Sequence, residues 1–270
     1  LELQNQLRIK GEKILHFFAS NRLVANPSKT GLLIFRPKVQ TQVHDDKLTI
    51  ELAGETITET DDQRVLGIII RNNLKWSDQK DKIKHECLYR LSVLRRLRSH
   101  LNNRQLKIIA EGLVVSRLRY CLHVWGAEFI RTSDSDPLSA IAHELQVIQN
   151  DALRVITGKK MQDHERVRDM LTATGMLSIN QIAAYSTLVE MWKARAFNVP
   201  HLSTLLSATL ARGGRTLRSE SSNHLQASVD EPFTLCASRL WNATSDRFKT
   251  TNLLAVAKAE AKKAAKQLPI

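Results

Sequence analysis

The chain has few of the residues that turn or cross-link a polypeptide. Its 270 residues include ten glycines, six prolines and three cysteines. Scarce glycine and proline favour long helices over many short strands. Cys87, Cys121 and Cys236 are odd in number and far apart, so neither a disulfide framework nor a paired-cysteine metal site is expected. This cysteine usage favours a reducing, intracellular compartment, nuclear or cytoplasmic.

Several sequence signatures are also missing. The nine histidines form no HExxH pattern, and no GxSxG, Walker lysine motif or GxGxxG occurs, which leaves hydrolase, phosphate-loop and Rossmann functions without support. No apolar run reaches 18 residues, so no membrane partner is expected. The first residues, LELQNQLRIK, contain no initiator Met and no apolar core of a signal peptide. We therefore expect neither a leader nor a complete reading-frame start.

What the chain has in excess is positive charge. Its formal net charge is +13, and the segment from Arg71 to Arg119 contains thirteen Lys and Arg against four Asp and Glu, a local net charge of +9. Such a concentrated field attracts polyanions, and nucleic acid is the commonest of these. The alternative is a basic surface that serves only solubility.

The first 72 residues combine one helical pattern with several short apolar runs. Residues 2–20 place Leu3, Leu7, Ile14 and Phe18 at helical spacing. Three or four strands are then expected, at Gly31–Phe35, in a hairpin formed by 47–52 and 55–58, and at Val65–Ile70 with Gly67 inside the strand.

After Trp76 the apolar period changes to that of helices. The first is expected at 78–101, with one apolar stripe formed by Ile83, Cys87, Leu91, Leu94, Leu97 and Leu101. Further helices are expected at 104–129, from Ile141 to Gly158, at 163–173, 178–197, 233–248 and 252–266. A linker is expected at 211–231.

Four groups of residues could carry chemistry. The pairs Asp45-Asp46 and Asp61-Asp62 could hold magnesium ions, but both occur in turn-like segments, which favour Asp for structural reasons. The four tryptophans could stack on bases, but three lie on apolar helical faces, so a core role is favoured. Lys29, between Ser28 and Thr30, would by itself be read as a solvated turn residue.

The order of the motifs is more specific than any one of them. An aromatic residue at Phe17 or Phe18 precedes Asn21, Leu23, Asn26, Lys29, Thr30 and Phe35, followed by Leu66-Gly67-Ile68 and Leu74-Lys75-Trp76. Later motifs are Arg119-Tyr120-x-x-x-Val124-Trp125-Gly126, Leu145-Gln146-x-x-Gln149-Asn150, Leu217-Arg218-Ser219 and Ser238-x-Leu240-Trp241-Asn242. This series resembles the reverse transcriptases of non-LTR (LINE-type) retrotransposons, downstream of their catalytic Asp-Asp hairpin.

The resemblance implies roles for individual residues. Lys29 matches the motif D lysine, which assists catalysis near the phosphates of the incoming nucleotide. Leu66 and Gly67 match the primer grip. The basic helices match the thumb, which holds the primer–template duplex through its phosphates. The cations expected to contact the backbone are Lys75, Lys80, Lys84, Arg95, Arg96, Arg98, Arg104 and Lys107.

One departure from the family limits the expected activity. The three catalytic carboxylates of these enzymes lie upstream of the position that matches Leu1, and Asp45-Asp46 follows motif D, so it cannot replace them. The Mg²⁺ ions of the full-length enzyme would then have no ligands here. We therefore expect no cofactor bound by this chain and no polymerase activity from it alone.

The expected fold is α+β: a partial polymerase palm at 1–72, a helical basic thumb at 73–160 and a helical C-terminal region at 161–270. The expected function is that of a reverse-transcriptase fragment, with an RNA–DNA or DNA duplex, the element RNA and the missing fingers and palm half as partners. The alternatives are a helical protein-interaction module and a decayed, non-functional element product.

Overall fold

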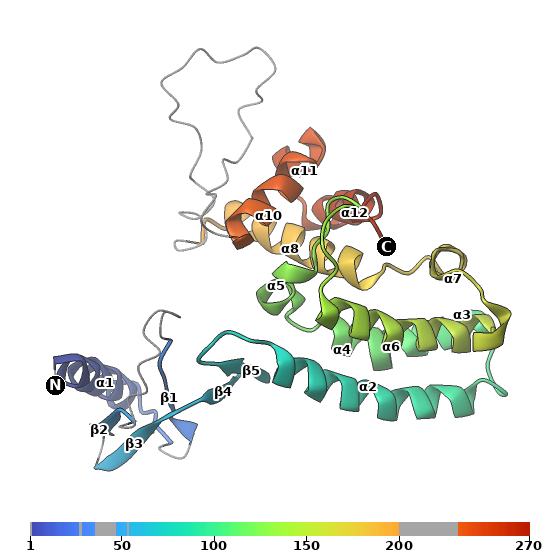
Figure 1. The fold of residues 1–270 in the computed structure, drawn as a ribbon. Coiled ribbons are helices and arrows are strands. Elements are labelled where there is room, and N and C mark those ends of the chain that lie inside the picture. Colours follow the sequence, from blue (N-terminus) through green and yellow to red (C-terminus); the bar gives the residue numbers. More distant parts are fainter. Residues whose placement is uncertain (1, 27–28, 36–46, 53, 200–231) are drawn as a thin grey trace, which may run out of the picture. The chain divides into compact units, whose positions relative to one another are not determined.

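The computed structural model describes residues 2–26, 29–35, 47–52, 54–199 and 232–270. The chain divides into two compact units, residues 1–79 and 80–270 (Figure 1). The first unit is mixed α+β and the second is helical in its described part, so the fold is α+β. The boundaries expected at 72 and 160 stay predictions, and the linker expected at 211–231 lies outside the described residues.

Helix α1 (Glu2–Ser20) occupies the expected residues. Of its expected apolar face, Leu7 and Phe18 are partly buried, whereas Leu3 and Ile14 are 52% and 53% exposed. None of its residues is fully buried. Leu7 contacts the small core made by Leu32, Ile50 and Ile57. A side chain at Gly11 would collide with Leu52, so this glycine lets the helix approach the sheet closely. The apolar face is therefore only partly covered.

The expected hairpin at 47–58 is confirmed. Strands β2 (Thr49–Leu52) and β3 (Glu55–Thr60) pair antiparallel, with Ile50 opposite Ile57. Gly54 in the turn has φ 79°, a conformation that glycine adopts without strain. The strand expected at Gly31–Phe35 is shorter: β1 (Leu32–Leu33) pairs parallel to β3.

The single strand expected at Val65–Ile70 is wrong. Strands β4 (Asp62–Val65) and β5 (Ile68–Arg71) form an antiparallel hairpin in which Val65 lies opposite Ile68. The two residues between them, Leu66 and Gly67, have φ values of 49° and 89°. Two consecutive positive φ values are those of a type I′ turn, so Gly67 turns the chain here.

The second unit is a set of packed helices (Figure 1). In chain order they are α2 (Ser77–Leu97), which starts at the end of the first unit, α3 (Asn103–Ala110), α4 (Ser116–Arg119), α5 (Leu122–Trp125), α6 (Ala140–Thr157), α7 (Val167–Thr174), α8 (Ile179–Ala196), α10 (Pro232–Asn242), α11 (Asp246–Thr250) and α12 (Leu254–Ala265). Short 3₁₀ turns occur at Ala127–Phe129 and Met161–Asp163. Gly158 ends α6 with φ 73°, as expected from the sequence.

The core of this unit surrounds α8 and contains three tryptophans. Trp192 on α8 packs with Trp241 on α10 and with residues of α11 and α12. Trp125, Trp192 and Trp241 are 1%, 3% and 1% exposed. The expected core role of these three aromatic residues is therefore confirmed, and none of them presents a ring to a base.

The continuous helix expected at 104–129 is also wrong. A π-helical segment, Glu111–Val115, follows α3 directly, and the backbone N–H of Ser116 donates to the carbonyl of Glu111, five residues back. The helix then ends at Tyr120, because Cys121 has φ 50°. The Trp125 indole N–H donates to the Tyr120 carbonyl at 3.1 Å and so satisfies an acceptor at the helix end.

Amide side chains join α6 to the start of α8. Gln149 is fully buried and donates to the Leu177 carbonyl at 2.7 Å. Gln146 donates to the Gln149 side chain at 3.0 Å and accepts from the backbone N–H of Ile179 at 2.9 Å. These bonds satisfy backbone groups at a buried helix N-terminus, which would otherwise lack partners.

Candidate nucleic-acid interface

The eleven residues expected to be functional are divided between the two units. Four lie in the first unit and seven in the second. Lys29 is exposed in a short turn, where its backbone N–H donates to the Asn26 carbonyl at 3.1 Å. The Thr30 hydroxyl donates to the same carbonyl at 3.0 Å, and a side chain at Gly31 would collide with Gln63 on β4. The turn is thus held against the β4–β5 hairpin, with the Lys29 side chain in solvent.

The primer-grip candidates form the tip of that hairpin. The Leu66 side chain is 86% exposed, an unusual position for a large apolar residue in a tight turn. Lys75, a few residues after β5, is also exposed, and its backbone N–H donates to the Asn73 side chain at 3.0 Å.

The carboxylate pairs do not form a metal site among the described residues. Asp61 accepts from the Asn72 side chain at 3.3 Å and lies 3.8 Å from the Lys47 ammonium, so it has a structural role near the start of β4. Asp45 and Asp46 lie outside the described residues. No group of three or more His, Cys, Asp or Glu side chains comes together in the described ranges.

Helix α2 carries four of the eight cations expected to contact the nucleic-acid backbone, and its packing decides how they can be used. Ile83, Cys87, Leu91 and Leu94 are buried, so this part of the expected apolar stripe is confirmed. Leu97 and Leu101 are only partly buried, and the helix ends at Leu97 instead of 101. Burial also raises the pKa of the Cys87 thiol to about 11, which excludes a reactive thiolate at neutral pH.

On one flank of this stripe, α2 is tied to α6 by shared carboxylates. Glu144 on α6 accepts from both Lys80 and Lys84, each at 3.1 Å. Asp151, two helical turns further along α6, pairs with Arg95 of α2 at 3.4 Å and with Arg154 of its own helix at 3.1 Å. Each carboxylate thus serves two cations. Lys80 also lies 3.0 Å from Asp81 on its own helix, so the Glu144 cluster is neutral and the Asp151 cluster keeps one net positive charge.

The opposite flank repeats this arrangement. Glu86 on α2 lies 3.7 Å from Arg90 on the same helix and 3.8 Å from Arg117 on α4. The three clusters therefore hold α2 in place, and those of Asp151 and Glu86 remain positively charged. Lys84, Arg95 and Arg117 are still about half exposed. An anion that approaches this helix meets cations that are already positioned.

The ion pairs also shift the pKa values of their members. Hydrogen bonds from Lys80 and Lys84 lower the pKa of Glu144, and bonds to Asp81 and Glu144 raise the pKa of Lys80. Both groups are therefore held in their charged forms at neutral pH.

The outward face of α2 holds residues that the sequence patterns did not single out. Tyr89 is 71% exposed and Leu88 is 44% exposed, and Arg96 lies two turns after Tyr89. Arg96 has no side-chain hydrogen bond or ion pair within the described ranges. An exposed aromatic beside cations can contact sugars or bases that a phosphate-binding helix brings close. The position of Tyr89 on the helix face opposite the buried stripe is the sequence feature that could have identified it.

The last three candidates lie at and after the end of α2. Arg98 donates to the Asn103 side chain and to the Ile156 carbonyl, which ties α2 to the end of α6. Lys107 lies 3.8 Å from Glu111. Arg104 is exposed in the first turn of α3, with no side-chain partner among the described residues. Arg96 and Arg104 are thus the two cations of this region most available to a ligand.

Comparisons with other proteins add nothing to this geometry. No helix among the described residues is long and apolar enough to cross a membrane. A scan against protein-family models, a search of curated proteins and a search of solved structures each found no match to this chain.

Proposed function

We propose that this chain is part of an RNA-directed DNA polymerase of a non-LTR retrotransposon, and that α2 binds the phosphates of a nucleic-acid duplex. The observation that carries the proposal is the arrangement of α2: three carboxylates are each shared by two cations, and Arg96 and Tyr89 face outward between the flanks. The order of the sequence motifs supports the polymerase origin.

Binding of this kind follows shape and charge rather than sequence. Cations that are already fixed by neighbouring carboxylates lose less side-chain entropy when they meet a phosphate. Phosphate contacts position a duplex but carry no base information. The chain is therefore expected to bind RNA–DNA and DNA duplexes of different sequence with similar affinity.

The test is the salt dependence of duplex binding, measured by fluorescence anisotropy with a labelled RNA–DNA duplex. Two clusters with one net positive charge each, together with Arg96 and Arg104, correspond to about four phosphates and a log–log slope of about −3.6. Arg96→Gln should reduce the magnitude of this log–log slope by about one. The matched control is Lys258→Gln on α12, an exposed cation far along the chain, which should leave the slope unchanged. A flat salt response, or equal effects of the two variants, would contradict the proposal.

A second candidate is a protein-interaction module, and the first unit provides the observation for it. Leu3, Phe17 and Val24 are 52%, 62% and 95% exposed on or just after α1. The small sheet covers only part of the apolar surface of this helix. Apolar surface of this kind marks binding sites. This candidate predicts no duplex affinity and concentration-dependent self-association in sedimentation velocity, which Phe17→Lys reduces and Arg96→Gln leaves unchanged.

A further inference from the structure

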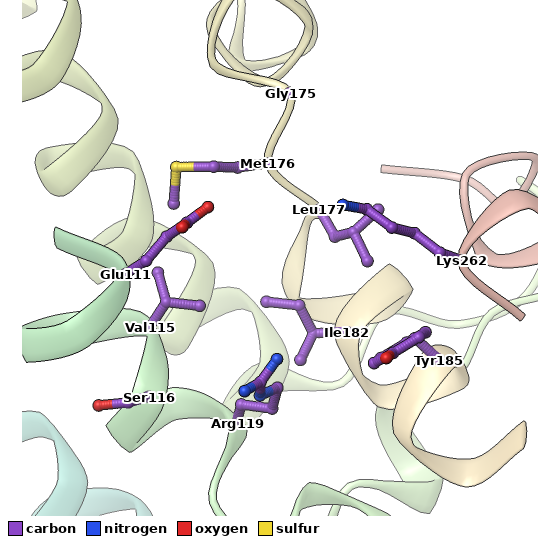
Figure 2. Close-up of a pocket in the computed structure, with 10 residues that line it drawn as sticks. All are labelled: Glu111, Val115, Ser116, Arg119, Gly175, Met176, Leu177, Ile182, Tyr185 and Lys262. Carbon is purple, nitrogen blue, oxygen red and sulfur yellow. The ribbon is translucent and has the colours of Figure 1, made fainter. Parts of the chain in front are cut away.

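A cavity of about 290 Å³ opens among four parts of the second unit (Figure 2). Its walls come from the π-helical segment with α4, from the loop Gly175–Leu177, from α8 and from α12. None of its lining residues belongs to the clusters on α2. However, α4 connects the two places, because Arg117 faces Glu86 of α2 and Arg119 lines the cavity.

The floor of the cavity is apolar. Met176, Leu177 and Ile182 are 7%, 9% and 3% exposed, and the half-buried Tyr185 stands beside them. A surface of this composition favours a flat apolar group over a hydrated ion. The volume is at the small end of ligand sites, so it suits one compact group and not an extended chain.

The rim is charged, and two of its cations have no protein partner. Arg119 on α4 and Lys262 on α12 are exposed, and neither has a side-chain hydrogen bond or ion pair with any described residue. Figure 2 shows both side chains directed toward the cavity from different elements. The carboxylate on the rim, Glu111, pairs instead with Lys107. Two converging cations above an apolar floor select a ligand that has both an anionic and a flat apolar part.

We propose that this cavity binds one unpaired nucleotide of a nucleic-acid strand, with the base on the apolar floor and the phosphate at Arg119 and Lys262. The inference deepens the proposed function, because it gives the duplex-binding unit a second site for single-stranded nucleic acid. It rests on that function for its context, but it can be tested without a duplex.

The test compares two labelled pentanucleotides with the same number of phosphates, one with normal bases and one in which every base is absent. The full chain is titrated with each by fluorescence anisotropy at physiological salt. The oligonucleotide with bases should bind about tenfold more tightly, since contact of one base with an aromatic and apolar surface contributes about that factor. The abasic one should retain only the affinity of its phosphates.

Two variants separate the two parts of the site. Ser116→Trp places a large ring at the exposed edge of the cavity and should remove the tenfold preference, with abasic binding unchanged. Arg119→Gln combined with Lys262→Gln should weaken binding of both oligonucleotides severalfold. Lys258→Gln, on the same helix as Lys262, is the charge-matched control and should change neither. Circular dichroism of each variant verifies that the helices remain folded.

The outcomes distinguish this site from the duplex site. Equal affinity for the two oligonucleotides, or a Lys258→Gln effect as large as that of the double variant, overturns the inference and leaves duplex binding by α2 untouched. A preference for bases that Ser116→Trp removes supports the inference even if the blunt duplex does not bind. That result would contradict only the proposed duplex binding by α2, and the proposed nucleotide site would stand.

Discussion

Replacement of Gln149 by Leu is expected to destabilise the second unit strongly. The side chain is fully buried on α6, and its amide donates to the Leu177 carbonyl at 2.7 Å while its oxygen accepts from Gln146 at 3.0 Å. Leucine fills a similar volume but makes neither bond. The Leu177 carbonyl, next to a buried helix start, would lose its side-chain donor.

The magnitude follows from these contacts. Each net hydrogen bond contributes about 0.5–1.5 kcal/mol, and a buried acceptor left without a donor costs about 1–3 kcal/mol. Part of this is recovered because leucine is more favourably buried than an amide. We therefore expect the free energy of unfolding to fall by about 2–4 kcal/mol, a large fraction of the stability of a typical domain.

Urea denaturation followed by tryptophan fluorescence measures this loss. Trp125, Trp192 and Trp241 are all buried in the second unit and report on its unfolding. The control is Gln162→Leu, an exposed glutamine in the turn after α6, for which a change below about 0.5 kcal/mol is expected. If Gln149→Leu were as stable as the parent, the hydrogen bonds of the Gln149 side chain would not stabilise the packing of α6 against α8, and the reasoning would be refuted.

Two further predictions concern a turn and an ion pair. Leu66→Asn should stabilise the first unit by about 0.5–1 kcal/mol, measured by native-state hydrogen exchange of the strand amides of that unit, since asparagine tolerates the φ of 49° and an 86% exposed leucine loses no burial; destabilisation would refute the turn assignment. Glu144→Gln should lower stability at neutral pH by less than about 1 kcal/mol, because its ion pairs are partly exposed. The folded state lowers the pKa of Glu144 from 4.5, so its contribution is present above pH 4.5 and is lost as pH falls through the lowered value. Urea midpoints of parent and variant should therefore converge in acid, and a constant difference would contradict this origin.

The elements with a regular apolar period could be read from the sequence. The buried stripe of α2, the β2–β3 hairpin and the end of α6 at Gly158 all follow from local patterns. Two local features could not be read in this way. The β4–β5 hairpin was hidden because its turn begins with leucine, which rarely adopts positive φ. The helix ends before Cys121, where the Trp125 indole N–H donates a hydrogen bond to the Tyr120 carbonyl. The spacing of apolar residues in the sequence gives no sign of this bond.

The candidate site shows the same limit. Charge density indicated α2 as the candidate helix, but not which of its cations form ion pairs. Glu144 and Asp151 are more than 45 residues away from the α2 cations they bind, so their pairing depends on how α6 packs. The role of the Gln146 and Gln149 motif is likewise visible only when the start of α8 lies beside it. Long-range pairing is what local sequence patterns leave undetermined.

The π-helical segment Glu111–Val115 has a consequence for the chain's tolerance of insertions and deletions. Such a segment amounts to one extra residue within an α-helix, and one residue corresponds to about 100° of rotation. Deletion of Gly112, whose Cβ position is open, would restore an uninterrupted α-helix. Because the wider turn absorbs the extra residue, the deletion should leave Arg117 facing Glu86 and Arg119 lining the cavity. The π-helical turn is therefore a place where the chain can lose one residue without displacing either Arg117 or Arg119.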